Sequence, residues 1–192
     1  MEIMWRKFRE SFEKFIVQDL KKALNAEVEV GVIILTVVGI ESLSGYYAGR
    51  KSDDETFKAF IDAFMPEYST HAVTLYKCIR NGLAHDYIIK EYEGKSFLFT
   101  RNAGEKHLTP VSQRNGWFYL NRRQFSLDFL KAQECFFEEL EVNNELQEKA
   151  LSRLNKKGFL DVFSFHVESI FVDSGNNEDE YNSATGTFSK GY

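Results

Sequence analysis

The octet RNGLAHDY at residues 80–87 brings together an arginine, an amide and a histidine. Arg80 supplies a permanent positive charge with forked donors, which fit a phosphate group and the charge that develops on it during cleavage. His85 can accept or donate a proton near neutral pH, and Asn81 adds a neutral amide that can orient either partner. These residue types suffice to cleave RNA without a metal ion. Arg80, His85 and Asn81 are therefore the candidate catalytic residues.

The spacing of Arg80 and His85 restricts the helix that must position them. Positions five apart lie about 500° round a regular α-helix, which leaves them about 140° away from a common face. Gly82 stands between them, and we expect the helix to loosen or end there. The long arginine side chain can bridge the remaining offset.

Each of these residues also has a purely structural interpretation. Arg80 can form a salt bridge with Asp86 or Glu41. His85 can cap the end of the helix, where a positive charge is favourable, and Tyr87 can be the first residue of a strand. A second, looser match of the same type occurs at residues 101–107, where Arg-Asn is followed by a histidine in a glycine-containing turn, and we interpret it as a coincidence.

The complete octet resembles the signature of the HEPN superfamily, R-x4–6-H with a polar residue directly after the arginine. In HEPN toxins that are paired with minimal nucleotidyltransferases the form is R-x4-H-x-Y, which Arg80, His85 and Tyr87 match residue by residue. The resemblance covers roughly residues 1–90 and a long helix expected at residues 126–156.

The resemblance implies a helical bundle that dimerises and brings two motifs into one cleft. It implies metal-independent RNA cleavage without a cofactor, in which the ribose 2′-OH attacks the adjacent phosphate and leaves a 2′,3′-cyclic phosphate and a 5′-OH end. His85 would be the general acid and base, Arg80 would steady the pentacoordinate phosphate, and Asn81 would position them. Tyr87 matches the tyrosine that the antitoxin modifies with AMP.

The function implied in this way is that of a bacterial toxin or defence ribonuclease. Its partners would be RNA, a second copy of the chain and a nucleotidyltransferase-type antitoxin. Glu41 or Ser44, at the end of a central helix, are further candidate polar contributors. The alternative is a non-catalytic HEPN-like module that binds RNA, a nucleotide or a protein. A third hypothesis is a helical regulator unrelated to the superfamily.

Composition excludes several other classes of protein. The 192 residues include only two cysteines, Cys78 and Cys135, which excludes a disulfide scaffold or a cysteine-rich zinc module and fits the reducing cytoplasm. The charges within residues 1–24 exclude a secretory signal. The most apolar run, Val30–Ile40, has eleven residues, whereas a membrane span needs about 20. We therefore expect a cytoplasmic chain without membrane contact, metal or cofactor.

The charge is unevenly distributed along the chain. The net charge is −5, and residues 159–192 hold one lysine and six acidic residues. Residues 77–131 hold ten basic and five acidic residues, which permits a phosphate-bearing partner but fits an ordinary solvated surface equally well. Within this stretch, Arg122 and Arg123 are the next candidates for RNA contact, with a surface pair beside a helix as the alternative. The aromatic strands that precede them favour a core over a base-stacking surface.

Periodicity predicts a mainly α fold, an antiparallel helical bundle with a small antiparallel β insertion. The predicted helices cover residues 2–24, 26–47, about 53–65, about 70–86 and 126–156. A meander at about residues 88–122 is predicted from four short runs, at residues 87–91, 96–100, 107–112 and 117–121. Alternating aromatic residues predict one more strand at residues 159–171. We expect one domain at residues 1–172 and a disordered polar tail at residues 173–192.

Overall fold

The most apolar segment of the chain forms the helix at the centre of the fold. In the computed structural model, which describes residues 2–102 and 104–157, this helix is α3, Glu29–Ala48. It is apolar nearly all round and packs against α2, α4, α7 and η3, so it is buried on several sides. Within the described residues, α3 is the one helix long and apolar enough to cross a membrane. More than half of that stretch is buried in the bundle, however, and the core helix of a water-soluble protein passes the same test.

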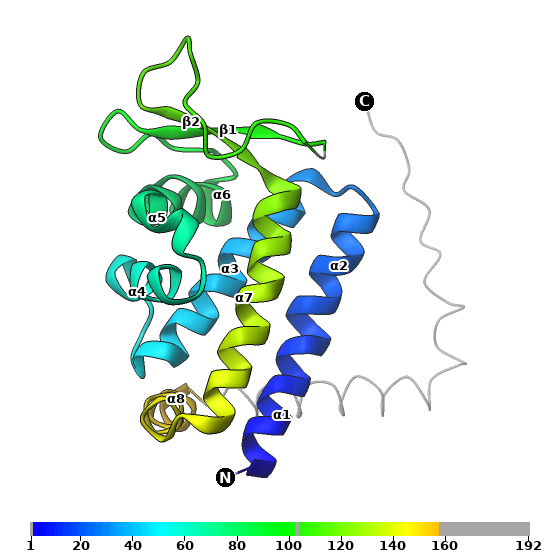
Figure 1. The fold of residues 1–192 in the computed structure, drawn as a ribbon, viewed down its shortest axis with the longest axis vertical. Coiled ribbons are helices and arrows are strands. Elements are labelled where there is room, and N and C mark those ends of the chain that lie inside the picture. Colours follow the sequence, from blue (N-terminus) through cyan, green and yellow to red (C-terminus); the bar gives the residue numbers. More distant parts are fainter. Residues whose placement is uncertain (1, 103, 158–192) are drawn as a thin grey trace, which may run out of the picture. The chain divides into compact units, whose positions relative to one another are not determined.

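The fold is mainly helical, as predicted, with a small sheet at one end of the bundle (Figure 1). The remaining helical elements are α1 (Glu2–Phe12), the π-helix η1 (Glu13–Val17), α2 (Gln18–Asn25), α4 (Asp54–Phe64), the 3-10 helix η2 (Pro66–His71), α5 (Ala72–Thr74), the π-helix η3 (Leu75–Arg80), α6 (Asn81–Asp86), α7 (Arg122–Val142) and α8 (Asn144–Lys157).

The predicted amphipathic helix at residues 2–24 is present, but it contains a π-turn. Trp5, Phe8 and Phe12 are buried as their spacing predicts. The wide turn η1 adds a residue to the helix, so that Val17 is buried and its neighbours Phe15 and Ile16 are only half-buried. Phe8 and Phe12 pack their rings against Phe137 of α7, with ring centroids 5.3 and 5.6 Å apart. This aromatic cluster joins the first helix to the bundle.

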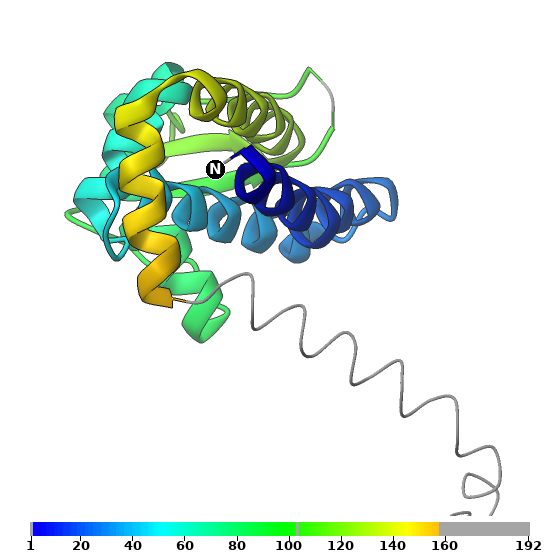
Figure 2. The same ribbon diagram turned by 90° about the horizontal axis from the view of Figure 1, so that it is seen from below.

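The predicted helix at residues 126–156 is two helices. Asn121 begins α7 earlier than expected, because its side-chain oxygen accepts the N–H of Gln124 at 3.0 Å. Asn143 has extended backbone angles and accepts the N–H of Leu146 at 3.1 Å, which ends α7 and begins α8. After this break, α8 runs across the direction of α7, as Figure 2 shows.

The prediction of an antiparallel meander is wrong. Strands β1 (Ser96–Thr100) and β2 (Trp117–Asn121) form a two-stranded parallel sheet, with Ser96 opposite Trp117. The long connection passes along the other edge of β2, where the Tyr119 N–H donates to the Thr109 carbonyl at 2.8 Å. That antiparallel pairing stays a single bridge at Pro110, because Leu108 has a positive φ of 50° and so leaves the extended conformation that a strand needs.

Two further predictions concern the ends of elements. Asp53 begins α4 as expected, since it accepts the Thr56 N–H while the threonine hydroxyl accepts the Asp53 N–H. The run at residues 87–91 is not a strand.

Residues 1–156 form one compact unit. The predicted strand at residues 159–171 and the predicted tail at residues 173–192 lie outside the described residues.

Candidate functional site

The candidate catalytic octet lies at the end of a helical stretch that changes type several times. From Pro66 to Asp86 the chain passes through a 3-10 helix, a short α-helix, the π-helix η3 and then α6. Arg80 is the last residue of the π-turn, and α6 continues in regular α conformation through Gly82. We expected the helix to loosen or end at Gly82. The helix instead widens before Gly82, in the π-turn η3 that ends at Arg80, and π-turns are frequent at functional sites.

Gly82 is required by the chain that folds back over it. Tyr87 adopts left-handed backbone angles (φ 55°, ψ 24°) and reverses the direction of the chain. The returning segment places the carbonyl oxygen of Ile88 where a side chain at position 82 would begin, 2.2 Å from an added Cβ. The Lys90 N–H then donates to the Cys78 carbonyl at 3.1 Å. The glycine thus permits a close approach that fixes the end of α6.

Arg80 is held in one orientation by two neighbours. Its Nε donates to Glu41 Oε2 at 2.8 Å and its Nη2 to Glu41 Oε1 at 2.5 Å, which is a bidentate pair. Its Nη1 donates to Asn81 Oδ1 at 2.8 Å, and the guanidinium lies 5.4 Å from the centre of the Tyr76 ring. Only 22% of the Arg80 side chain is exposed. The hydrogen bonds to Glu41 raise the pKa of Arg80, so the cation is permanent and already oriented.

The structure brings Arg80, Asn81 and Glu41 together. The backbone of His85 lies in the last turn of α6, and its side chain lies outside the part of the chain that is described. Ser44 belongs to a different cluster, because its hydroxyl meets that of Ser52 at 2.7 Å and donates to the Glu41 carbonyl. Of the two further polar residues that the sequence suggested, Glu41 therefore belongs to the candidate site and Ser44 does not.

Tyr87 is not the first residue of a strand. Its side chain is 76% exposed at the C-terminal end of α6, beside Ile88, which is 62% exposed. An accessible phenol at a helix end is open to a modifying enzyme or to a second protein chain.

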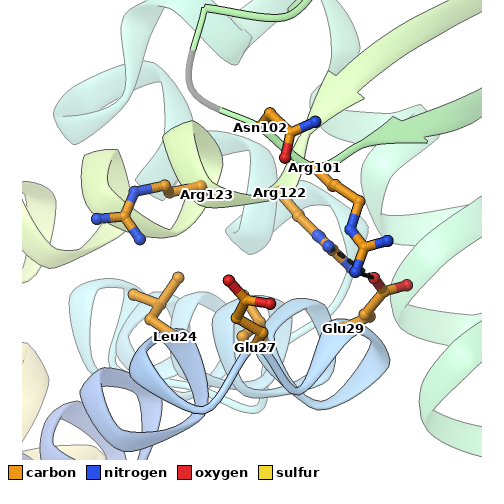
Figure 3. A pocket seen from close by; sticks show the side chains of 8 residues that line it. Leu24, Glu27, Glu29, Arg101, Asn102, Arg122 and Arg123 are labelled. Carbon is orange, nitrogen blue, oxygen red and sulfur yellow. Dashed lines mark hydrogen bonds and ion pairs between the residues drawn. The ribbon is translucent and has the colours of Figure 1, made fainter.

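The second candidate group, Arg122 and Arg123, borders a hollow of about 510 Å³ between the turn before α3 and the start of α7 (Figure 3). Arg122 Nη2 and Arg101 Nη2 lie 3.0 and 2.7 Å from the same oxygen, Glu29 Oε1. Hydrogen bonding by Arg122, with both cations nearby, lowers the pKa of Glu29. Arg123 extends away from this cluster and forms no ion pair or hydrogen bond with the described residues. Sequence reasoning missed Arg101 and Glu29 as members of this group.

A buried polar network lies on the other side of α7. The Tyr68 hydroxyl donates to Asp128 Oδ2 at 2.8 Å and lies 2.9 Å from His107 Nε2. His107 Nδ1 accepts the N–H of Asn121 at 3.0 Å, so the proton of the neutral ring is on Nε2 and points to the tyrosine. Burial lowers the pKa of His107. In the looser Arg-Asn…His match, His107 therefore belongs to this partly buried network, whereas Arg101 borders the hollow.

Among the described residues, no three histidine, cysteine or acidic side chains are grouped so that they could hold a metal ion. No protein-family model matches the chain, and neither the curated proteins nor the solved structures contain a significant match to it.

Proposed function

We propose that the chain is a metal-independent endoribonuclease of HEPN type, acting as a toxin or in defence. The observation that carries the proposal is Arg80, a partly exposed guanidinium oriented by Glu41 and Asn81 directly before the helix turn that carries His85. A pre-oriented cation stabilises charge that develops in a transition state without the cost of reorganisation.

In the proposed reaction, an RNA phosphodiester approaches the end of α6. The imidazole of His85 accepts the proton of the ribose 2′-OH, whose oxygen attacks the adjacent phosphorus. The bond from phosphorus to the 5′-oxygen breaks, and that oxygen takes a proton from the imidazolium of His85, which returns to its neutral form. Arg80 donates to the phosphate oxygens as the fifth bond forms, and Asn81 keeps the guanidinium in place. The products are a 2′,3′-cyclic phosphate and a 5′-OH end.

The proposal includes a homodimer. Because α6 is regular between Arg80 and His85, their Cα atoms face directions about 140° apart. A second copy can supply the missing half of each site. The exposed Tyr87 and Ile88 beside the motif favour such a contact. Tyr87 is equally accessible to a nucleotidyltransferase-type antitoxin in the cytoplasm, which is the regulator that the proposal implies.

The test is cleavage of single-stranded RNA by the purified chain in excess EDTA, with analysis of the product ends. Arg80→Ala and His85→Ala should each slow cleavage by about 100-fold or more. Arg80→Lys keeps the positive charge but loses the planar pair of N–H donors, so it should retain only part of the wild-type rate. Arg6→Ala removes an exposed arginine whose ion pair among the described residues is with Glu10, and it is the matched control. Equal rates for wild type, Arg80→Ala and His85→Ala would refute the catalytic assignment.

One observation favours the second candidate function, a non-catalytic HEPN-like binding module. Both oxygens of Glu41 already hold Arg80 and neutralise its charge. A guanidinium paired in this way can stabilise the fold without meeting a substrate. This alternative predicts RNA, nucleotide or protein binding without cleavage, and only a mild effect of His85→Ala on that binding.

A further inference from the structure

An excess of basic over acidic residues is found in the β element, which we define as residues 95–123. Residues 95–123 contain six lysines and arginines and a single acidic residue, Glu105, in a chain whose net charge is −5. Glu105 is used locally, because its Oε2 accepts the backbone N–H groups of Arg101 and Asn102 at 2.7 and 3.0 Å. The surface of this element therefore carries the positive charge that a polyanion would meet.

Arg101 lies between two hollows of this surface. The first is the hollow of about 510 Å³ that it shares with Arg122 and Arg123. In Figure 3, Arg101 and Arg122 both point toward Glu29. One carboxylate oxygen receives two guanidinium groups there, at 2.7 and 3.0 Å, which is the arrangement that a phosphate oxygen takes between arginines. Glu29 thus acts as an internal substitute for an anionic ligand.

The second hollow, of about 520 Å³, continues from Arg101 over Lys106 and Tyr119. The Lys106 ammonium lies 5.0 Å from the centre of the Tyr119 ring. Trp117 lies two residues before Tyr119 on the same face of β2, and the guanidinium of Arg114 lies 4.5 Å from the centre of its ring. Each half-buried aromatic ring therefore has a cation above it. The basic residues come from the flanking turns, so they do not alternate with the aromatic residues in the sequence.

We propose that the two hollows joined at Arg101 form a binding site for single-stranded RNA. A phosphate lies between Arg101 and Arg122 in place of the Glu29 carboxylate, with Arg123 at the opening. The neighbouring base stacks on Tyr119 as the lysine moves from the ring to the backbone. Stacking needs an unpaired base, whereas any base has a face to offer, so the site takes single strands of any sequence.

The identity of the polynucleotide as RNA depends on the proposed function, whereas the site itself does not use the candidate catalytic residues. The two are therefore separable by experiment. An oligomer of about 12 nucleotides with 2′-O-methyl groups cannot be cleaved through a 2′-OH. Binding of this oligomer to the wild-type chain, measured by fluorescence anisotropy over a range of salt, reports the site even if the chain cleaves no RNA.

Tyr119→Ala should weaken binding by about fivefold or more, and Tyr119→Phe should bind like wild type because it keeps the ring. Arg101→Ala should lower the slope of log K against log salt by about 0.7, the value for one lost phosphate contact on a single strand. Glu29→Gln should tighten binding by about two- to fivefold, because the internal competitor is gone. A duplex of the same sequence should bind more weakly than the single strand.

The matched control is again Arg6→Ala, an equal loss of charge on α1. If Arg101→Ala and Tyr119→Ala bind like this control while their thermal unfolding is unchanged, the proposal is overturned. A weaker complex with Glu29→Gln would also overturn it, because the carboxylate would then be helping the ligand and not competing with it. Loss of binding by Tyr119→Phe would assign the effect to the hydroxyl and contradict stacking.

Discussion

Replacing Gly82 with alanine should destabilise the chain, although the same change in the middle of a helix is normally favourable. Alanine gains about 1 kcal/mol over glycine from helix propensity. Here the added Cβ would lie 2.2 Å from the Ile88 carbonyl oxygen, a backbone atom that cannot swing aside. Overpacking of this kind costs about 1–3 kcal/mol. Shifting the returning segment also weakens the hydrogen bonds from Ile88 to Gly82 and from Lys90 to Cys78, at about 1 kcal/mol each. The expected net loss is about 2–4 kcal/mol.

Thermal unfolding followed by circular dichroism measures this effect, which should lower the Tm by about 4–16 °C for a chain of this size. Gly31→Ala in α3 is the matched control. Its Cβ would meet only a methyl group of Val28, a side chain that is 50% exposed and can rotate away. The control should therefore be as stable as wild type or more stable. A Gly82→Ala chain with an unchanged or higher Tm would refute the close approach that defines the end of α6.

Three further predictions concern charge and exposure. Glu41→Gln leaves a mostly buried guanidinium without its counter-charge and should cost about 1–2 kcal/mol; an unchanged urea midpoint would contradict this. Burial lowers the pKa of His71 and His107, so the unfolded chain binds more protons once the pH falls below about 6.5. Stability should be flat just above that pH and should be lost progressively below it, and a Tm that does not change between about pH 7.5 and pH 5.5 would argue against the buried neutral rings. Only Cys135 should react rapidly with a thiol reagent, because Cys78 is buried and burial raises its pKa to about 11; rapid labelling of both cysteines would contradict the packing of Cys78.

Local signals in the sequence were enough to predict the helices that begin and end with recognisable residues. The capping residues before α4 and the apolar run of α3 each act within a few positions, so periodicity and capping rules apply to them directly. The break at Asn143 was missed because asparagine is tolerated within a helix, and only the changed direction of α8 makes the cap necessary. The position of Ser44 in a separate buried cluster likewise depends on Ser52, which no spacing rule connects to it.

The candidate site was predictable only in part. The octet could be recognised from the sequence. The ion pair between Arg80 and Glu41 was predicted as one of two possible pairs. The parallel direction of the strands and the pairing of Arg101 with Glu29 were not. Both arise because the long connection after β1 passes along the far edge of β2, which brings residues distant in the sequence into contact and leaves no periodic pattern.

The π-turns have a consequence for the length of the chain. Each holds one residue more than a regular helix would need, and η3 sets the rotation at which Arg80 meets Glu41. Deleting one residue between Leu75 and Ile79 would remove this extra residue and leave the helix after it in nearly the same rotation, so Arg80 should still face Glu41. Deleting one residue from the regular helix α6 would instead turn everything after it by about 100°, so the π-turn is where this helical stretch should best tolerate a chain that is one residue shorter.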